Sequence, residues 1–84
     1  RGEFPLYRAA AGGHLAEVQS LLQQGADPKL RTRFGWAPLH WAAKEGYSEI
    51  VKLLLAYGAD PNPRSDTGQR PISMTSNPYI RQLL

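Results

Sequence analysis

The 84-residue chain contains no cysteine, and this absence excludes disulfide bridges and thiolate metal sites. No apolar run approaches the ~20 residues that a membrane-spanning helix requires. The first four residues, Arg-Gly-Glu-Phe, lack the pattern of a signal peptide. We therefore expect an intracellular protein, cytoplasmic or nuclear, that does not span a membrane.

The sequence also lacks the residue patterns of catalytic and cofactor sites. Its two histidines, His14 and His40, have no further zinc ligand at a suitable spacing, so structural hydrogen bonding is the favoured role for both. There is no Gly-x-Gly-x-x-Gly motif and no phosphate-binding loop. The seven acidic residues are scattered along the chain. These features predict a protein that is not an enzyme and that needs no metal or cofactor.

What the chain does contain is a repeat with a period of 33 residues. The segment 34–61 is related to the segment 33 residues before it through a proline, paired alanines, apolar helix residues and a Gly-Ala-Asp-Pro stretch. The matching positions are Pro5, Leu6, Ala9, Ala10, Val18, Leu21, Leu22 and 25–28 with Pro38, Leu39, Ala42, Ala43, Val51, Leu54, Leu55 and 58–61. A constant period of this length indicates stacked repeats, each burying its apolar face on its neighbours.

Each repeat is expected to form two short helices. In the first repeat they begin at Pro5 and near Leu15, and Gly25 ends the second in a left-handed conformation. In the second repeat the pattern predicts helices over 38–44 and about 48–56, with the serine at position 48 as the N-cap.

The end of the chain follows the same plan in a reduced form. Pro71 begins a first helix, and Asn77 followed by Pro78 is a strong helix start. The last helix is therefore expected over 79–84, with Ile80 and two leucines as its apolar residues.

The motifs Pro-Leu-His-x-Ala-Ala at 38–43 and Gly-Ala-Asp at 58–60 resemble the ankyrin repeat in order and spacing. The resemblance covers nearly the whole chain. It implies an all-α fold, a short solenoid of antiparallel helix pairs joined by hairpin-like turns. As a single domain over 1–84, the chain would hold repeats at about 2–33, 34–66 and 67–84, the last acting as a C-terminal cap. The family threonine is Ala37 here, so His40 must find another acceptor or point at water.

The resemblance also implies where a partner would bind, because the turn fingers and the exposed side of each first helix form a concave face in this family. Carrying that face over position by position selects Arg33, Phe34, Trp36, Lys44, Glu45, Asp66, Thr67 and Gln69. We expect Arg33, Phe34, Trp36 and Lys44 at the centre of the contact and Arg31 and Glu45 at its rim, so the predicted site has nine residues. Trp36 either contacts the partner or covers the adjacent repeat. Trp41 occupies a position that usually carries a core leucine, so a structural role is favoured.

These observations predict a protein–protein interaction module without chemistry of its own, acting as a monomer. The basic residues on the fingers leave open either an acidic partner or a solvated loop, and they include Lys29, Arg31, Arg33, Arg64 and Arg70. Nucleic acid is disfavoured because no helix is rich in arginine. The alternative is an assembly element that packs on other domains or repeats of its parent chain. The sequence begins within a repeat's turn, which is consistent with a piece of a longer protein.

Overall fold

The computed structural model describes residues 5–84, and this part of the chain is helical without any strand. The helices are α1 (Pro5–Ala11), α2 (Leu15–Gln23), α3 (Pro38–Glu45), α4 (Ser48–Ala56), α5 (Pro71–Met74) and α6 (Pro78–Leu83). The all-α architecture expected from the sequence is confirmed. No helix within the described range has the length and apolar character needed to cross a bilayer.

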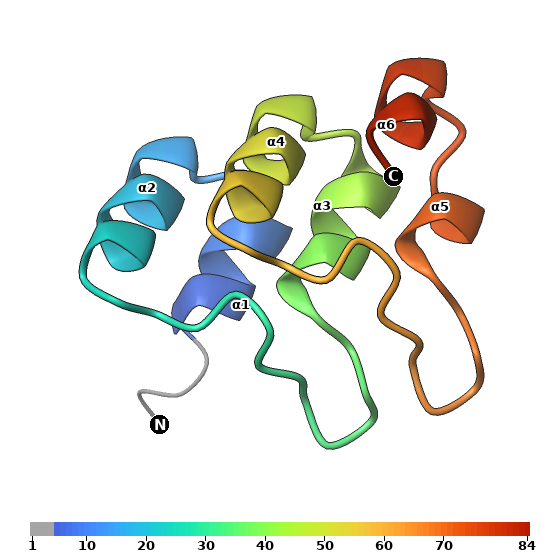
Figure 1. Cartoon of the computed structure of the whole chain (residues 1–84), viewed down its shortest axis with the longest axis horizontal. Coiled ribbons are helices and arrows are strands. Elements are labelled where there is room, and N and C mark those ends of the chain that lie inside the picture. The colour runs from blue at the N-terminus through green and yellow to red at the C-terminus, as the bar shows by residue number, and fades with distance from the viewer. Residues whose placement is uncertain (1–4) are drawn as a thin grey trace.

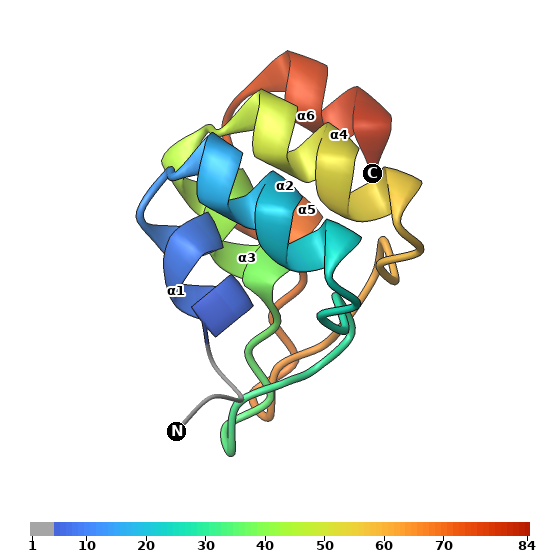
Figure 2. The same ribbon diagram turned by 90° about the vertical axis from the view of Figure 1, so that its left-hand side faces the viewer.

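The helices form two parallel rows, as Figures 1 and 2 show from two directions. α1, α3 and α5 lie side by side in one row, and α2, α4 and α6 form the other. The connections 24–37 and 57–70 project together from one side of the stack, and we call them the first finger and the second finger. Successive repeats are therefore in contact both through their helices and through their fingers.

Small residues allow the helices of the inner row to pack closely. Ala42 and Ala43 of α3 are fully buried, as are Ala9 and Ala10 of α1 at the equivalent positions. The second row adds branched apolar side chains to the same core, namely Val18, Leu22, Ile50, Val51 and Leu54. The helix-ending role of Gly25 is confirmed by its φ of +96°.

The helix boundaries follow the predictions to within one residue. Helix α6 spans Pro78–Leu83 instead of the predicted 79–84, and a further correction concerns α4. This helix spans Ser48–Ala56 as expected, but its N-cap is Tyr47, which makes no side-chain capping hydrogen bond. Ser48 is already the first helical residue, so its assignment as the cap was wrong by one position. Helix α3 extends one residue further than predicted, to Glu45.

The third helix pair packs on the second despite its short elements. The Oδ1 atom of Asn77 accepts hydrogen bonds from the backbone N–H groups of Tyr79 and Ile80 at 2.8 and 3.2 Å, which confirms the predicted start of α6. Ile80 is fully buried, and Leu83 and Leu84 pack partly buried against the core. The expected start of the first repeat, at residue 2, lies outside the described residues.

Candidate interaction surface

The two fingers contain the same turn, built from equivalent residues 33 positions apart. In the first finger, the backbone N–H of Thr32 donates to the carbonyl of Trp36 at 2.9 Å, and the Thr32 hydroxyl accepts from the Trp36 N–H at 3.2 Å. In the second, Ser65 and Gln69 make the corresponding bonds at 2.9 and 3.1 Å. A hydroxyl and backbone groups therefore define this turn, without a contribution from large side chains at its tip.

The first finger is held against the second by hydrogen bonds that include backbone groups of both fingers. The N–H of Asp66 donates to the carbonyl of Phe34 at 3.0 Å, and Nη1 of Arg31 donates to the carbonyl of Arg64 at 2.6 Å. Gly35 has a φ of +85°, and a Cβ atom there would lie only 2.8 Å from the Asp66 nitrogen. Glycine is therefore required at this position both by its conformation and by the close approach of the second finger.

At three equivalent positions the fingers differ in character: the first finger has Arg33, Phe34 and Trp36, and the second has Asp66, Thr67 and Gln69. The Phe34 side chain is 60% exposed, and the Arg33 guanidinium lies 5.5 Å from the centre of its ring. The second finger demonstrates that the turn forms without aromatic residues. The aromatic character of the first finger is thus not a requirement of its fold.

Trp36 lies in the corner between the first finger and α3, where it contacts two side chains of that helix. Its ring centre is 5.1 Å from that of Trp41, with the planes tilted by 44°, and 5.0 Å from that of His40, edge to face. Nε1 of Trp41 donates to the hydroxyl of Tyr7 on α1, and burial raises the pKa of that hydroxyl. We call Tyr7, Trp36 and Trp41 the aromatic ledge, which joins two repeats and one finger.

Both tryptophans are half-buried, so each combines a packing role with an exposed part of its ring. Trp36 covers α3 and still reaches the surface, and Trp41 lies at the edge of the core rather than within it. The Lys44 ammonium is 5.9 Å from the centre of the Trp41 ring, so a cation adjoins the ledge.

His40 connects α3 to the second finger from inside the structure. The N–H of Ala37 donates to Nδ1 at 2.9 Å, which leaves the proton of the neutral ring on Nε2. Nε2 donates in turn to the carbonyl of Gln69 at 2.9 Å. The ring is completely buried, and this burial lowers the pKa of His40. The acceptor that the sequence left undetermined is therefore a backbone carbonyl of the next repeat.

The structure brings only some of the nine predicted site residues together. Arg33 and Phe34 form the tip of the first finger, and Trp36 and Lys44 each lie close to the ring of Trp41. The other five predicted residues lie outside these two groups. Arg31 bonds to the second finger, and Glu45 is exposed at the end of α3. Asp66 is exposed on the second finger, and the side chains of Thr67 and Gln69 form hydrogen bonds within that finger.

Tyr7 and Trp41 are not among the nine predicted residues, because a structural role was favoured for Trp41 and no neighbour was expected for Tyr7. The available signal was the 33-residue register, which places Tyr7 at the position of His40 in the next repeat. The hydrogen bond between Tyr7 and Trp41 joins residues 34 apart, and only the stacking of α1 on α3 shows it.

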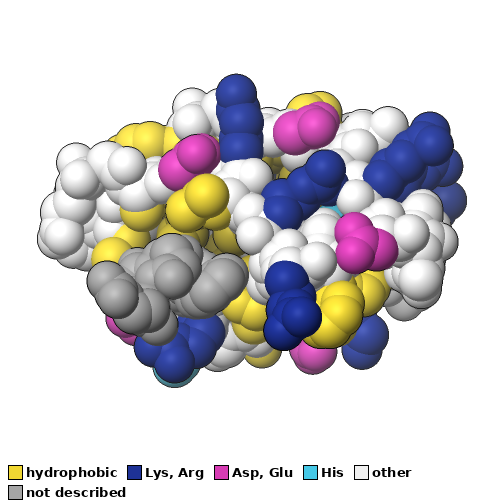
Figure 3. All heavy atoms as spheres, turned by 90° about the horizontal axis from the view of Figure 1, so that it is seen from below, with side chains coloured by type: hydrophobic (Ala, Val, Ile, Leu, Met, Phe, Trp, Pro, Cys, Tyr) yellow, Lys and Arg dark blue, Asp and Glu magenta, His cyan; other side chains and the backbone are white. Residues whose placement is uncertain are grey.

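Viewed from the side of the fingers, the surface carries cations and carboxylates interspersed with apolar patches, as Figure 3 shows. The predicted basic run therefore does not form one continuous basic face. Among the described residues, no group of three or more potential metal ligands gathers anywhere on the structure.

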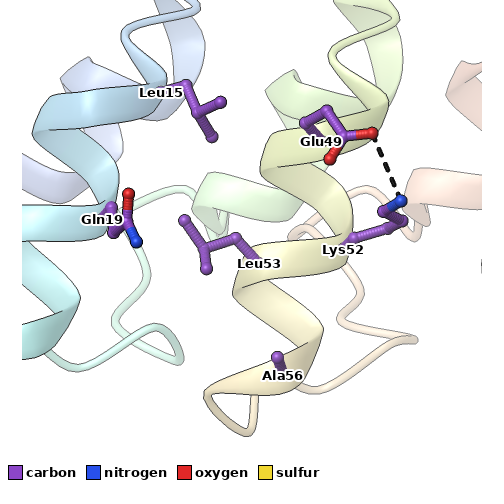
Figure 4. A pocket seen from close by; sticks show the side chains of 6 residues that line it. All are labelled: Leu15, Gln19, Glu49, Lys52, Leu53 and Ala56. Carbon is purple, nitrogen blue, oxygen red and sulfur yellow. Dashed lines mark ion pairs between the residues drawn. The ribbon is translucent and has the colours of Figure 1, made fainter.

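A hollow lies between α2 and α4, away from the aromatic ledge (Figure 4). It is a shallow groove of about 360 Å³ lined by Leu15, Gln19, Glu49, Lys52, Leu53 and Ala56. Lys52 and Glu49 pair with each other at 3.2 Å along the same helix. The groove therefore offers a small apolar strip whose neighbouring charges already neutralise each other.

Paired helices stacked in two rows, with fingers projecting from one side, define a helical-repeat protein. A family model described as ankyrin repeats (3 copies) matches residues 1–65, and the chain belongs to this family. Ankyrin repeats generally serve as protein–protein interaction modules and are typically non-catalytic. A search of the curated proteins found no match to the chain.

Proposed function

We propose that this domain is a non-catalytic module that binds another protein through its first finger and the adjoining face of α3. The observation that carries the proposal is the internal comparison of the two fingers. They share the same turn, yet only the first displays Phe34 and Trp36. Phe34 is exposed and Trp36 is half-buried, and the turn itself requires neither of them. Aromatic side chains are enriched among the energetic centres of protein interfaces.

The charges around these aromatic residues favour a partner with carboxylates. Arg33 adjoins Phe34, and Lys44 adjoins Trp41, so each aromatic group has an exposed cation beside it. Acidic side chains of the partner would meet these cations at the edge of the contact. Such exposed pairs mainly accelerate association and select the partner, and they weaken as salt is added.

The alternative, an assembly element, would need an apolar surface on the outer face of the first repeat, the face turned away from the second repeat. The residues of that face do not provide one. In the second repeat, three side chains turn towards the first: Trp41 bonds Tyr7, Tyr47 covers Gly13, and Leu53 points towards α2. The equivalent residues of the first repeat are Arg8, His14 and Ser20, which are polar and exposed. A surface with these residues offers little apolar area to a further repeat. We therefore propose that the domain acts as a monomer, with the 67–84 unit as its C-terminal cap.

The proposed function is tested by exchanging the first finger's aromatic residues for those of the second. The double variant Phe34→Thr, Trp36→Gln uses side chains that this turn already accommodates. Three proteins are immobilised and exposed to lysate of the source organism: the native domain, the double variant and a control. The control is Leu15→Ala, in the groove between α2 and α4. All three must first show cooperative thermal unfolding.

We expect the native domain and the Leu15→Ala control to retain a common protein that the double variant loses. Retention of the same proteins by the double variant would contradict the proposal. Sedimentation over a range of concentrations tests the alternative, because an assembly element should self-associate where the proposed module stays monomeric.

A further inference from the structure

We propose that the aromatic ledge binds an acidic, proline-containing segment of the partner in an extended polyproline II conformation. This inference rests on the proposed function and adds the chemical class of the bound segment. Three features of the described residues carry it: the arrangement of the indole rings, a free hydrogen-bond donor and the position of a cation.

The indole rings provide a preorganised apolar surface. Trp36 and Trp41 lie 5.1 Å apart between ring centres, and each is half-buried, so each is held by packing while part of its ring is exposed. Trp36 is further restrained by edge-to-face contact with the buried ring of His40. Rigid, flat apolar surfaces match the rigid ring of proline, and little conformational entropy is lost because neither side has to be ordered.

The hydrogen-bond donors of the two indoles differ in availability. Nε1 of Trp41 already donates to Tyr7. Nε1 of Trp36 has no acceptor within residues 5–84, and its ring is partly exposed. A polyproline II segment has no internal hydrogen bonds, so its carbonyl oxygens are free to accept. The Trp36 N–H is thus the donor that would fix the register of such a segment on the ledge.

The neighbouring charge gives the segment its acidic character. The exposed Lys44 ammonium lies 5.9 Å from the centre of the Trp41 ring, at the end of the ledge on α3. Arg33 supplies a second exposed cation at the tip of the first finger, three residues before Trp36 in the sequence. A carboxylate beside the prolines would therefore be matched by Lys44 at the α3 end of the ledge.

The chain offers a direct readout, because Trp36 and Trp41 are its only tryptophans and both belong to the ledge. Intrinsic fluorescence is titrated with three capped peptides, Glu-Pro-Pro-Pro-Pro-Glu, Glu-Ala-Ala-Ala-Ala-Glu and Lys-Pro-Pro-Pro-Pro-Lys. We expect saturable binding of the first peptide, with at least about fivefold weaker binding of each of the other two.

Two variants define the position of the site. Trp36→Gln should abolish binding of the acidic proline peptide while Trp41 continues to report. Leu15→Ala, in the groove between α2 and α4, should bind it as the native domain does. If Trp36→Gln does not fold, Lys44→Ala provides the second test, because it should reduce the preference for the Glu-flanked peptide over the Lys-flanked one and leave the preference for proline unchanged.

Equal binding of the proline and alanine peptides would overturn the inference, as would no binding of any peptide or an equal loss in Leu15→Ala. These results are distinguishable from failure of the proposed function. The inference fails if the domain shows no preference for the proline peptide, even when partner capture still depends on Phe34 and Trp36. The proposed function fails if the double variant captures the same proteins as the native domain.

Discussion

Nε2 of His40 donates a hydrogen bond to the carbonyl of Gln69 at 2.9 Å, so a buried ring of α3 holds the second finger in place. The same ring accepts the N–H of Ala37 at the end of the first finger. One neutral imidazole thus connects both fingers to the inner row of helices. A proton added at Nδ1 would face the Ala37 N–H and break this arrangement.

The first prediction concerns the pH dependence of stability. Burial lowers the pKa of His40 from its ordinary value of 6.5, so the unfolded chain takes up its proton at a higher pH than the folded domain. The contribution of neutral His40 to the free energy of unfolding is complete above pH 6.5. It is lost as the pH falls from there through the pKa of His40 in the folded domain. One such group gives a slope of at most about 1.4 kcal/mol per pH unit.

Urea unfolding of the native domain and of His40→Gln at pH 7.5 and pH 5.5 measures this slope. The variant keeps the exposed His14 and all carboxylates, so its own pH dependence is the baseline. The native domain should lose more stability on acidification than the variant. Parallel losses would show that His40 does not titrate in this way.

The second prediction separates backbone strain from steric contact between the fingers. Gly35 and Gly68 have nearly the same φ, +85° and +86°, but only at Gly35 would a Cβ atom meet the neighbouring finger. Gly68→Ala should cost about 1–2 kcal/mol from the left-handed conformation alone. Gly35→Ala should cost clearly more in the same unfolding experiment. Equal costs would mean that the fingers separate easily.

The third prediction is that Phe34 is dispensable for folding. Its side chain is 60% exposed, and the second finger has threonine in its place. Phe34→Thr should therefore change the free energy of unfolding by no more than about 0.5 kcal/mol. Thermal denaturation followed by circular dichroism measures the change. A loss of about 2 kcal/mol or more would identify Phe34 as a core residue and remove it from the interaction surface.

The fourth prediction concerns the bond between Tyr7 and Trp41, which connects the first two repeats. Tyr7→Phe removes the acceptor of the indole N–H and should destabilise the domain by about 0.5–1.5 kcal/mol. Because Trp41 loses its partner, the fluorescence emission of the folded variant should also shift. An unchanged spectrum together with unchanged stability would argue that this bond is absent in solution.

The fifth prediction tests the C-terminal unit. Ile80 is fully buried, whereas its neighbour Tyr79 is 46% exposed. Ile80→Ala should cost about 2–5 kcal/mol, and Tyr79→Ala much less. If the unit acts as a cap, the loss at Ile80 should lower the melting temperature of the whole domain in a single transition. A separate early transition would indicate that the unit unfolds alone.

Much of the fold could be predicted from the sequence because helices depend on local interactions. Pro38 begins α3 and Asn77 caps the start of α6 as expected, since both signals act within one turn of helix. The error at Ser48 arose from relying on this local preference alone. Ser48 is itself helical, and Tyr47 takes the cap position without a side-chain hydrogen bond. Boundaries are set by the path of the preceding loop as well as by local preference.

The candidate site was only partly predictable. The register identified Phe34 as an aromatic residue that the turn does not need, and the second finger explains why. The sequence register could not show that the Gln69 side chain accepts a hydrogen bond within its own finger. Nor could it show that Tyr7 accepts a hydrogen bond from Trp41 and so belongs to the aromatic ledge. These outcomes depend on side-chain directions across the repeat boundary.

The sequence by itself determined the 33-residue period, the helix pairs and the family to which the chain belongs. Only the tertiary structure decided which residues of different repeats meet. The contacts that build the surface are those of Tyr7 with Trp41, Arg31 with Arg64 and His40 with Gln69, which are 34, 33 and 29 residues apart. Hydrogen bonds along a helix require only neighbouring residues, whereas these contacts exist because the repeats stack at one distance and in one register.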